Sequence, residues 1–160
     1  MTNREFVLET MKRSGKLAAQ SIQTHSASMT GTALNTEAMY IPEFVASCKK
    51  MNMLDRHAGL TDGFVCKSSA GRIVRLLQNY DSTVFLHEDG TPLEPEELSA
   101  QWGFVWSNNP EHAKPFVAIS TSPYMRGNCC TENGTTYRST MDNNVHAPSA
   151  YPDGWEVCNT

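Results

Sequence analysis

An internal repeat of a short, glycine-centred unit narrows the choice of folds for this chain. The stretch GFVCKSSAGRIVRL at 63–76 parallels GNCCTENGTTYRS at 127–139, and PEFVAS at 42–47 parallels KPFVAIS at 114–120. In both copies an initial glycine is followed by a second one after seven or eight residues, and an apolar residue, Val74 or Tyr137, stands three positions beyond it. A repeat of this kind predicts two similar supersecondary units in tandem.

Each unit has the pattern of a β-hairpin. Asn133-Gly134 is the strongest two-residue turn signal, because both positions tolerate positive φ and a type I′ turn matches the twist of the strands. Ala70-Gly71 is a weaker version of the same signal. A two-stranded hairpin is not stable alone in water, so further strands must cover it. Both units end on a tryptophan after a proline-containing loop, Trp102 and Trp155, and such a ring supplies much of a small core.

The N-terminal stretch 3–24 predicts an amphipathic helix. Thr2 or Asn3 can cap it, and Glu5 suits its first turn. Apolar residues recur at three- and four-residue spacing, namely Phe6, Val7, Met11, Leu17, Ala18 and Ile22. Such a stripe must be buried, either on the body of the chain or on a neighbouring subunit. We therefore predict oligomerisation through four of these residues: Phe6, Met11, Leu17 and Ile22.

The remaining pattern completes the predicted fold class, mainly β with an N-terminal α-helical segment and two small tandem β modules. Residues 26–32 form a connector, a short helix through 35–40 stops before Pro42, and Pro95 begins a single helical turn. Short apolar runs punctuated by Gly, Pro and Asn then predict β structure. The predicted domains are a helical anchoring or oligomerisation segment (1–38), a degenerate β module (39–107) and a second β module (114–160).

Charge and hydropathy exclude two classes of partner. The net charge is −4 and the 13 Lys and Arg are scattered, which argues against nucleic-acid binding. No run approaches the ~20 apolar residues of a membrane-spanning helix. The N-terminus lacks the apolar core of a secretory signal, which predicts folding in a cytoplasm.

No catalytic or metal motif is visible in the chain. The five cysteines lack the Cys-x-x-Cys spacing of structural zinc sites, which favours small buried thiols, namely Cys48, Cys66, Cys129, Cys130 and Cys158. The carboxylates of 88–97 form a solvated face, and no nucleophile motif or phosphate-binding loop is present. We predict a protein that is not an enzyme and needs no cofactor or metal.

The second unit resembles the small chitin-binding type of carbohydrate-binding module. The matching residues are Tyr124, Gly127, Asn128, Cys130, Gly134, Tyr137, Asn144, Pro148 and Trp155. In sugar-binding members, two adjacent exposed aromatic residues follow the hairpin tyrosine and form a stacking platform. Thr140 and Met141 stand at those positions here, and Asn128 and Cys130 replace an Asp and a Val. The resemblance thus implies the scaffold without its main platform.

The whole chain is similar to a group of small phage and prophage tail-region proteins. The similarity covers TGTALNTEAMYIPEF at 30–44, AQWGF at 100–104, and the module at 114–156 with its DNNV stretch. It implies a virion component of the tail region, made in the cytoplasm of the bacterial host. Its partners would be other tail or fibre proteins.

Sugar binding in such modules depends on flat aromatic faces beside amide groups. The candidate ligand-binding residues are Tyr124, Asn143, Asn144 and Tyr151. In the competing interpretation Tyr137 turns inward to meet Trp155 in the core, and the two asparagines shape a turn. Trp106 is predicted to pack the two modules together.

The sequence favours a non-catalytic, tail-associated structural or display protein that is oligomeric through its N-terminal helix. An oligomer would strengthen any weak site through avidity. Two alternatives stay open at this point. One is a glycan-binding module that recognises a cell-wall or capsular polysaccharide of the host, and the other is an accessory domain of a polysaccharide hydrolase.

Overall fold

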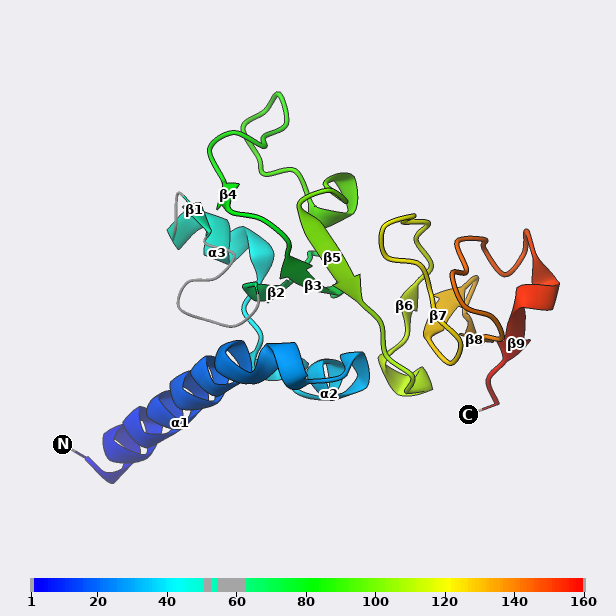
Figure 1. The fold of residues 1–160 in the computed structure, drawn as a ribbon. Helices are drawn as coiled ribbons and strands as arrows, with labels where there is room; N and C mark the ends of the chain where they lie inside the picture. The colour runs from blue at the N-terminus through cyan, green and yellow to red at the C-terminus, as the bar shows by residue number, and fades with distance from the viewer. Residues whose placement is uncertain (1, 51–52, 55–62, 160) are drawn as a thin grey trace.

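A computed structural model describes residues 2–50, 53–54 and 63–159 of the chain (Figure 1). An N-terminal helix, α1 (Asn3–His25), is followed by the short helices α2 (Gly31–Thr36) and α3 (Phe44–Lys50).

A three-stranded sheet consists of β2 (Val65–Lys67), β3 (Ile73–Leu76) and β5 (Trp102–Val105). A four-stranded sheet consists of β6 (Lys114–Pro115), β7 (Cys129–Glu132), β8 (Thr135–Ser139) and β9 (Trp155–Val157). A small pair joins β1 (Met53–Leu54) to β4 (Tyr80–Asp81). The predicted fold class is confirmed, since a helical N-terminus precedes two small sheets.

Helix α1 begins where the sequence predicted and ends one residue later. Thr2 is its N-cap: Glu5 N donates to Thr2 Oγ1 at 3.1 Å, and Thr2 N donates to Glu5 Oε2 at 2.7 Å. This reciprocal capping box satisfies two backbone donors that a helix start would otherwise leave unpaired. The helix then continues through Gly15 to His25 without a break.

The segment after α1 is more helical than predicted. The expected connector 26–32 contains a 3-10 turn, Ser26–Ser28, and the start of α2, which Thr30 caps through Ala33 N at 3.1 Å. A second 3-10 turn, Ala38–Tyr40, precedes Pro42 as the sequence indicated. Helix α3 was not predicted, because 44–50 is too short to show helical periodicity clearly. The predicted turn at Pro95 is present as Pro95–Glu97.

The sequence repeat is a repeat of strand topology. In the first copy β2 and β3 form a hairpin, and β5 adds to β3 with Trp102 opposite Leu76. In the second copy β7 and β8 form a hairpin, and β9 adds to β8 with Trp155 opposite Ser139. The segments upstream also correspond: Glu43 pairs in parallel with Lys67, and Pro115 pairs in parallel with Thr131.

Both hairpin turns have a glycine with positive φ. Asn133 has φ 51° and Gly134 has φ 79°, as a type I′ turn requires. Gly71 has φ 81° in the longer turn of the first copy. The predicted two-residue turn is confirmed at Asn133-Gly134, whereas at Ala70-Gly71 only the glycine has positive φ and the type I′ turn is absent.

The same three kinds of ring form the centre of each module. In the first, Phe44 and Tyr80 meet the edge or face of Trp102 at centroid distances of 5.4 Å each. In the second, Phe116 and Tyr124 meet Trp155 at 6.0 and 5.4 Å. These near-perpendicular contacts suit aromatic quadrupoles and bury large apolar areas.

Trp106 joins the two modules, as predicted. Its ring stacks on Phe104 of the first module at 5.5 Å and on Tyr124 of the second at 4.2 Å. Its Nε1 donates to Ser122 O at 2.9 Å, and Arg72 Nη2 donates to Pro115 O at 2.5 Å. The two sheets therefore share a continuous aromatic contact, and Figure 1 shows them side by side.

Candidate functional site

Two of the four predicted ligand-binding residues are internal. Tyr124 is 1% exposed, and its ring lies between Trp106 at 4.2 Å and Phe116 at 5.4 Å. Asn144 is fully buried, and its Nδ2 donates to Gly154 O at 3.0 Å and Ser139 Oγ at 3.1 Å. Neither side chain offers a surface to a glycan, so both are corrected from ligand contacts to core residues.

The core of the second module also differs in one contact from the prediction. Trp155 is buried, as expected, and its Nε1 donates to His146 O at 2.8 Å. The tyrosine ring that meets it is Tyr124, at 5.4 Å, whereas Tyr137 is only half-buried and packs at the margin of the cluster. The backbone of Tyr124 pairs with that of Asn144: Tyr124 N donates to Asn144 O at 2.9 Å, and Asn144 N donates to Tyr124 O at 2.8 Å. This pairing holds Tyr124 where its ring packs against Trp155.

The other two predicted ligand residues are exposed. Asn143 has a positive φ of 55° in the turn that precedes Asn144. Tyr151 is 43% exposed, and its ring lies 5.7 Å from that of His146. A Cβ on Gly154 would come within 2.8 Å of Tyr151 Cδ1 and 3.2 Å of Met141 Sδ, so the ring is seated closely on this glycine. Tyr151 is therefore a fixed, partly exposed ring.

The cysteines Cys129 and Cys130 are buried, and two of the acidic residues in 88–97 form ion pairs. Burial raises the pKa of the Cys129 thiol to about 11 and that of Cys130 to about 12, so both are protonated at neutral pH. No group of three or more His, Cys, Asp and Glu able to hold a metal is found among the described residues. Of the carboxylates in 88–97, Glu96 accepts from Arg72 Nη1 at 3.0 Å, and Glu97 meets His87 Nε2 at 3.1 Å.

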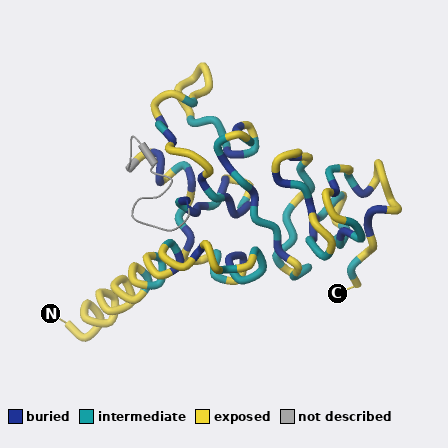
Figure 2. The backbone as a smooth tube through the Cα atoms, viewed as in Figure 1, coloured by how far each residue is buried: buried dark blue, intermediate teal, exposed yellow. Residues whose placement is uncertain are grey.

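The most unusual surface of the described chain is the N-terminal half of α1. Figure 2 shows that this half is exposed on every turn, and Figure 1 shows it extending away from both sheets. Its apolar side chains are 48–65% exposed, namely Phe6, Val7, Leu8 and Met11. An amphipathic helix normally buries its apolar stripe, whereas this half of α1 leaves apolar side chains in water.

The C-terminal half of α1 is fixed to the body. Ile22 is buried in a cluster with Leu34 and Val65. The side-chain amide of Gln23 forms two hydrogen bonds with the backbone of Val65 in β2. Val65 N donates to Gln23 Oε1 at 2.9 Å, and Gln23 Nε2 donates to Val65 O at 2.6 Å. Arg75 Nη2 donates to Ser26 O at 2.7 Å. These contacts make the free half of α1 the continuation of an anchored helix.

The four predicted oligomerisation residues do not share one surface. Ile22 belongs to the core of the chain itself, so its assignment to a subunit interface is corrected. A helix advances 100° per residue, which places Phe6 about 160° from Ile22. Leu17, eleven positions after Phe6, returns to the same side as Phe6, whereas Met11 lies on the side of Ile22. Two faces of α1 are thus apolar, and the sequence prediction merged them.

The face on the side of Ile22 is the continuous one. Residues at alternating three- and four-residue spacing follow it without a polar interruption, namely Leu8, Met11, Gly15, Ala18 and Ile22. We call this set the inner stripe. Phe6 and Leu17, on the opposite side, are separated by Thr10, Arg13 and Ser14. The predicted stripe left out Leu8 and Gly15, and the spacing of these two residues relative to Met11 and Ala18 completes the inner stripe.

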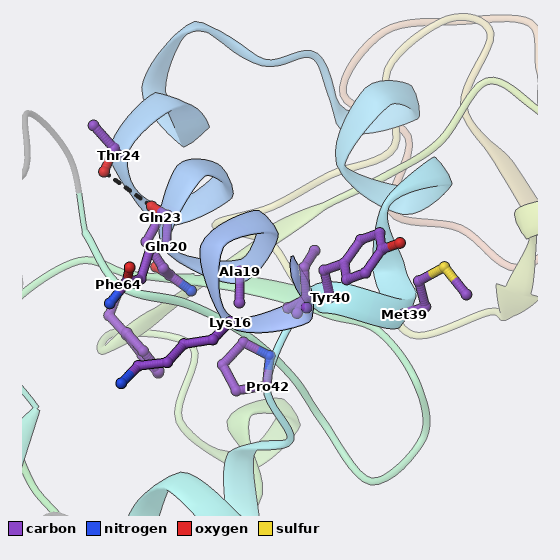
Figure 3. A pocket seen from close by; sticks show the side chains of 11 residues that line it. Lys16, Ala19, Gln20, Gln23, Thr24, Met39, Tyr40, Pro42 and Phe64 are labelled. Carbon is purple, nitrogen blue, oxygen red and sulfur yellow. Dashed lines mark hydrogen bonds between the residues drawn. The ribbon is translucent and has the colours of Figure 1, made fainter. Parts of the chain in front are cut away.

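A groove of about 1000 Å³ opens beside the C-terminal end of the inner stripe (Figure 3). Its walls are α1, through Gly15 and Ala19, and the segment with Met39 and Tyr40. Phe64 closes one side. Gly15 has open space where a Cβ would stand, and Met39 is 78% exposed. The sequence did not reveal this groove, because its two walls come from distant segments.

No protein-family model, curated protein or solved structure matches the chain. Within the described residues, none of the helices combines the length and apolar character needed to cross a bilayer.

Proposed function

We propose that this chain is a non-catalytic structural or display protein of the phage tail region that assembles through α1. The observation that carries the proposal is the exposed N-terminal half of α1, which extends away from both sheets with its apolar side chains in water. Exposed apolar surface of this kind marks a protein–protein contact in soluble proteins. The anchored second half of the helix would transmit that contact rigidly to the two modules.

The modules support a display role in this proposal. Their aromatic rings are mostly engaged in two internal trios and in the Trp106 stack, which makes the modules one connected body. The positions of the usual sugar platform carry Thr140 and Met141, and Thr140 Oγ1 donates to Asp153 O at 3.0 Å. In the part of the chain that the structure describes, the two connected modules lack an aromatic platform for sugar stacking. We therefore assign them to display, with their position fixed by assembly through α1. The location in a virion is the part of the proposal that rests on the sequence resemblance alone.

The proposal predicts that the chain is a constituent of phage particles. Purified particles from the phage or induced prophage that encodes the chain should contain it in the tail fraction, at more than one copy per particle. Quantitative mass spectrometry of fractionated particles measures both properties. Absence of the chain from particles whose known tail proteins are all detected would contradict the proposal.

A second candidate function is glycan binding by the exposed edge of the second module. One observation favours it: Tyr151 packs on Gly154 and still presents 43% of its surface, and the ring of His146 lies 5.7 Å from its own. A closely packed ring beside a polar side chain can stack on a sugar and bond its hydroxyls at little entropic cost.

In that case Tyr151→Ala should weaken retention of the protein on host cell envelopes by about 5- to 150-fold, since stacking contributes roughly 1–3 kcal/mol in comparable aromatic contacts. Retention is measured by pull-down with intact envelopes, while circular dichroism checks the fold. Leu86→Ala, which removes a 40% exposed apolar side chain of the first module, is the matched control and should leave retention unchanged. Equal retention of all three proteins would exclude Tyr151 as a glycan contact.

A further inference from the structure

We propose that the partner of the inner stripe is a second copy of this chain, whose α1 packs against it in antiparallel orientation. The inference rests on the proposed function, because it specifies the assembly through α1. It commits to a two-fold pair in which the free halves of both helices overlap and the two bodies lie at opposite ends.

The first argument is the distribution of charge along the two flanks of the inner stripe. One flank carries Glu5, Glu9, Lys12 and Lys16 at spacings of four, three and four residues. The other flank carries Asn3, Val7, Thr10 and Ser14, none of them charged. All four charged residues are exposed, so they are available to a partner. Any charge pairing across the stripe therefore involves only the first flank.

Orientation follows from which flanks meet. When two copies of one helix pack antiparallel through the same stripe, like flanks face each other, whereas parallel packing brings opposite flanks together. An antiparallel pair therefore sets the charged flank against itself in reversed order. Glu5 and Glu9 of one copy then lie beside Lys16 and Lys12 of the other, and each such pair occurs twice by symmetry. A parallel pair would leave these charges opposite uncharged residues.

The apolar contacts fit the same arrangement. Leu8 and Met11 lie near the middle of the charged series, so reversing one helix brings these two side chains of both copies together at the symmetry axis. Arg4 continues the stripe at its N-terminal end. In reversed order it comes opposite Gly15 and Ala18, whose small size leaves room for its stem.

The groove gives the end of the partner helix a place. The N-terminal end of an antiparallel partner points towards the body of the first copy and reaches the inner stripe near Gly15 and Ala18. The groove opens at this point, between α1 and the exposed Met39 and Tyr40 (Figure 3). The groove therefore offers the end of an approaching helix further apolar surface.

Distances between spin labels at two sites on α1 decide the orientation. One sample carries Asn3→Cys and the other Thr10→Cys, both in full-length protein in which Cys158, the half-buried cysteine, is replaced by serine. The other four cysteines are buried. Both label sites lie on the uncharged flank, away from the inner stripe, so the lateral part of the separation is similar for the two.

In an antiparallel pair, moving the label from residue 10 to residue 3 adds about 21 Å of separation along the helix axis, because each copy shifts by seven residues at 1.5 Å. We expect double electron–electron resonance to give a distance roughly 5–15 Å longer at residue 3 than at residue 10. Equal distances at the two sites would overturn the antiparallel pair while leaving assembly through α1 intact. No dipolar coupling at either site, at concentrations where the protein is folded, would overturn the assembly itself.

Discussion

Replacing Trp155 with alanine should remove about 3–5 kcal/mol from the free energy of unfolding, the range for deletion of a large buried ring. Trp155 is 7% exposed and forms edge contacts with Phe116 and Tyr124. The buried apolar cluster of the second module contains only three residues, Tyr124, Cys130 and Trp155, with further rings packed around it. A core of this size cannot close over the cavity that the indole would leave.

Equilibrium urea unfolding, followed by near-ultraviolet circular dichroism, measures this loss. Val157→Ala is the matched control, since Val157 lies on the same strand and is 56% exposed, and we expect a change within about 0.5 kcal/mol. Trp155→Phe keeps most of the ring and loses the bond to His146 O, so it should fall between the two. A loss below about 1 kcal/mol for Trp155→Ala would show that the second module does not depend on this ring.

The second large effect concerns assembly. The double substitution Leu8→Asp with Met11→Asp should weaken association of the chain at least about a hundredfold, because burying each such side chain contributes roughly 1.5–3 kcal/mol and a carboxylate at the interface costs more. Both residues are exposed in the single chain, so the fold of the body should persist. Sedimentation velocity over a dilution series gives the dissociation constant.

The matched control is Phe6→Asp with Leu17→Asp. It introduces the same charge at two residues that are 63% and 66% exposed, on the opposite side of α1. The inner-stripe pair predicts that this control associates like the unmodified protein. If the control dissociates and the Leu8 and Met11 variant does not, the interface lies on the Phe6 face. That result would preserve assembly through α1 and reject the antiparallel pair.

Local signals in the sequence predicted much of the fold. The helix start at Thr2, the turn at Asn133-Gly134 and the repeat of hairpins depend on residues close together in the chain, and the structure shows each of them. The linker role of Trp106 was also predictable, because one large ring between two small cores has few other places to pack.

Long-range contacts decided what the sequence did not predict. Tyr124 was predicted to contact a ligand through its aromatic face, but pairing with Asn144 and stacking on Trp106 bury it. The stripe of α1 was read as one surface, although Ile22 and Phe6 lie on opposite sides of the helix. The sequence of α1 alone does not show which of its residues are buried. Ile22 is buried because it packs against Leu34 and strand residues that are distant in the sequence.

The mass of the unmodified chain in solution tests the central claim, assembly through α1, most directly. Light scattering coupled to size-exclusion chromatography should give about twice the 17.8 kDa of one chain at concentrations well above the dissociation constant, and a smaller value on dilution. A mass of one chain at every concentration, up to the limit of solubility, would contradict the account.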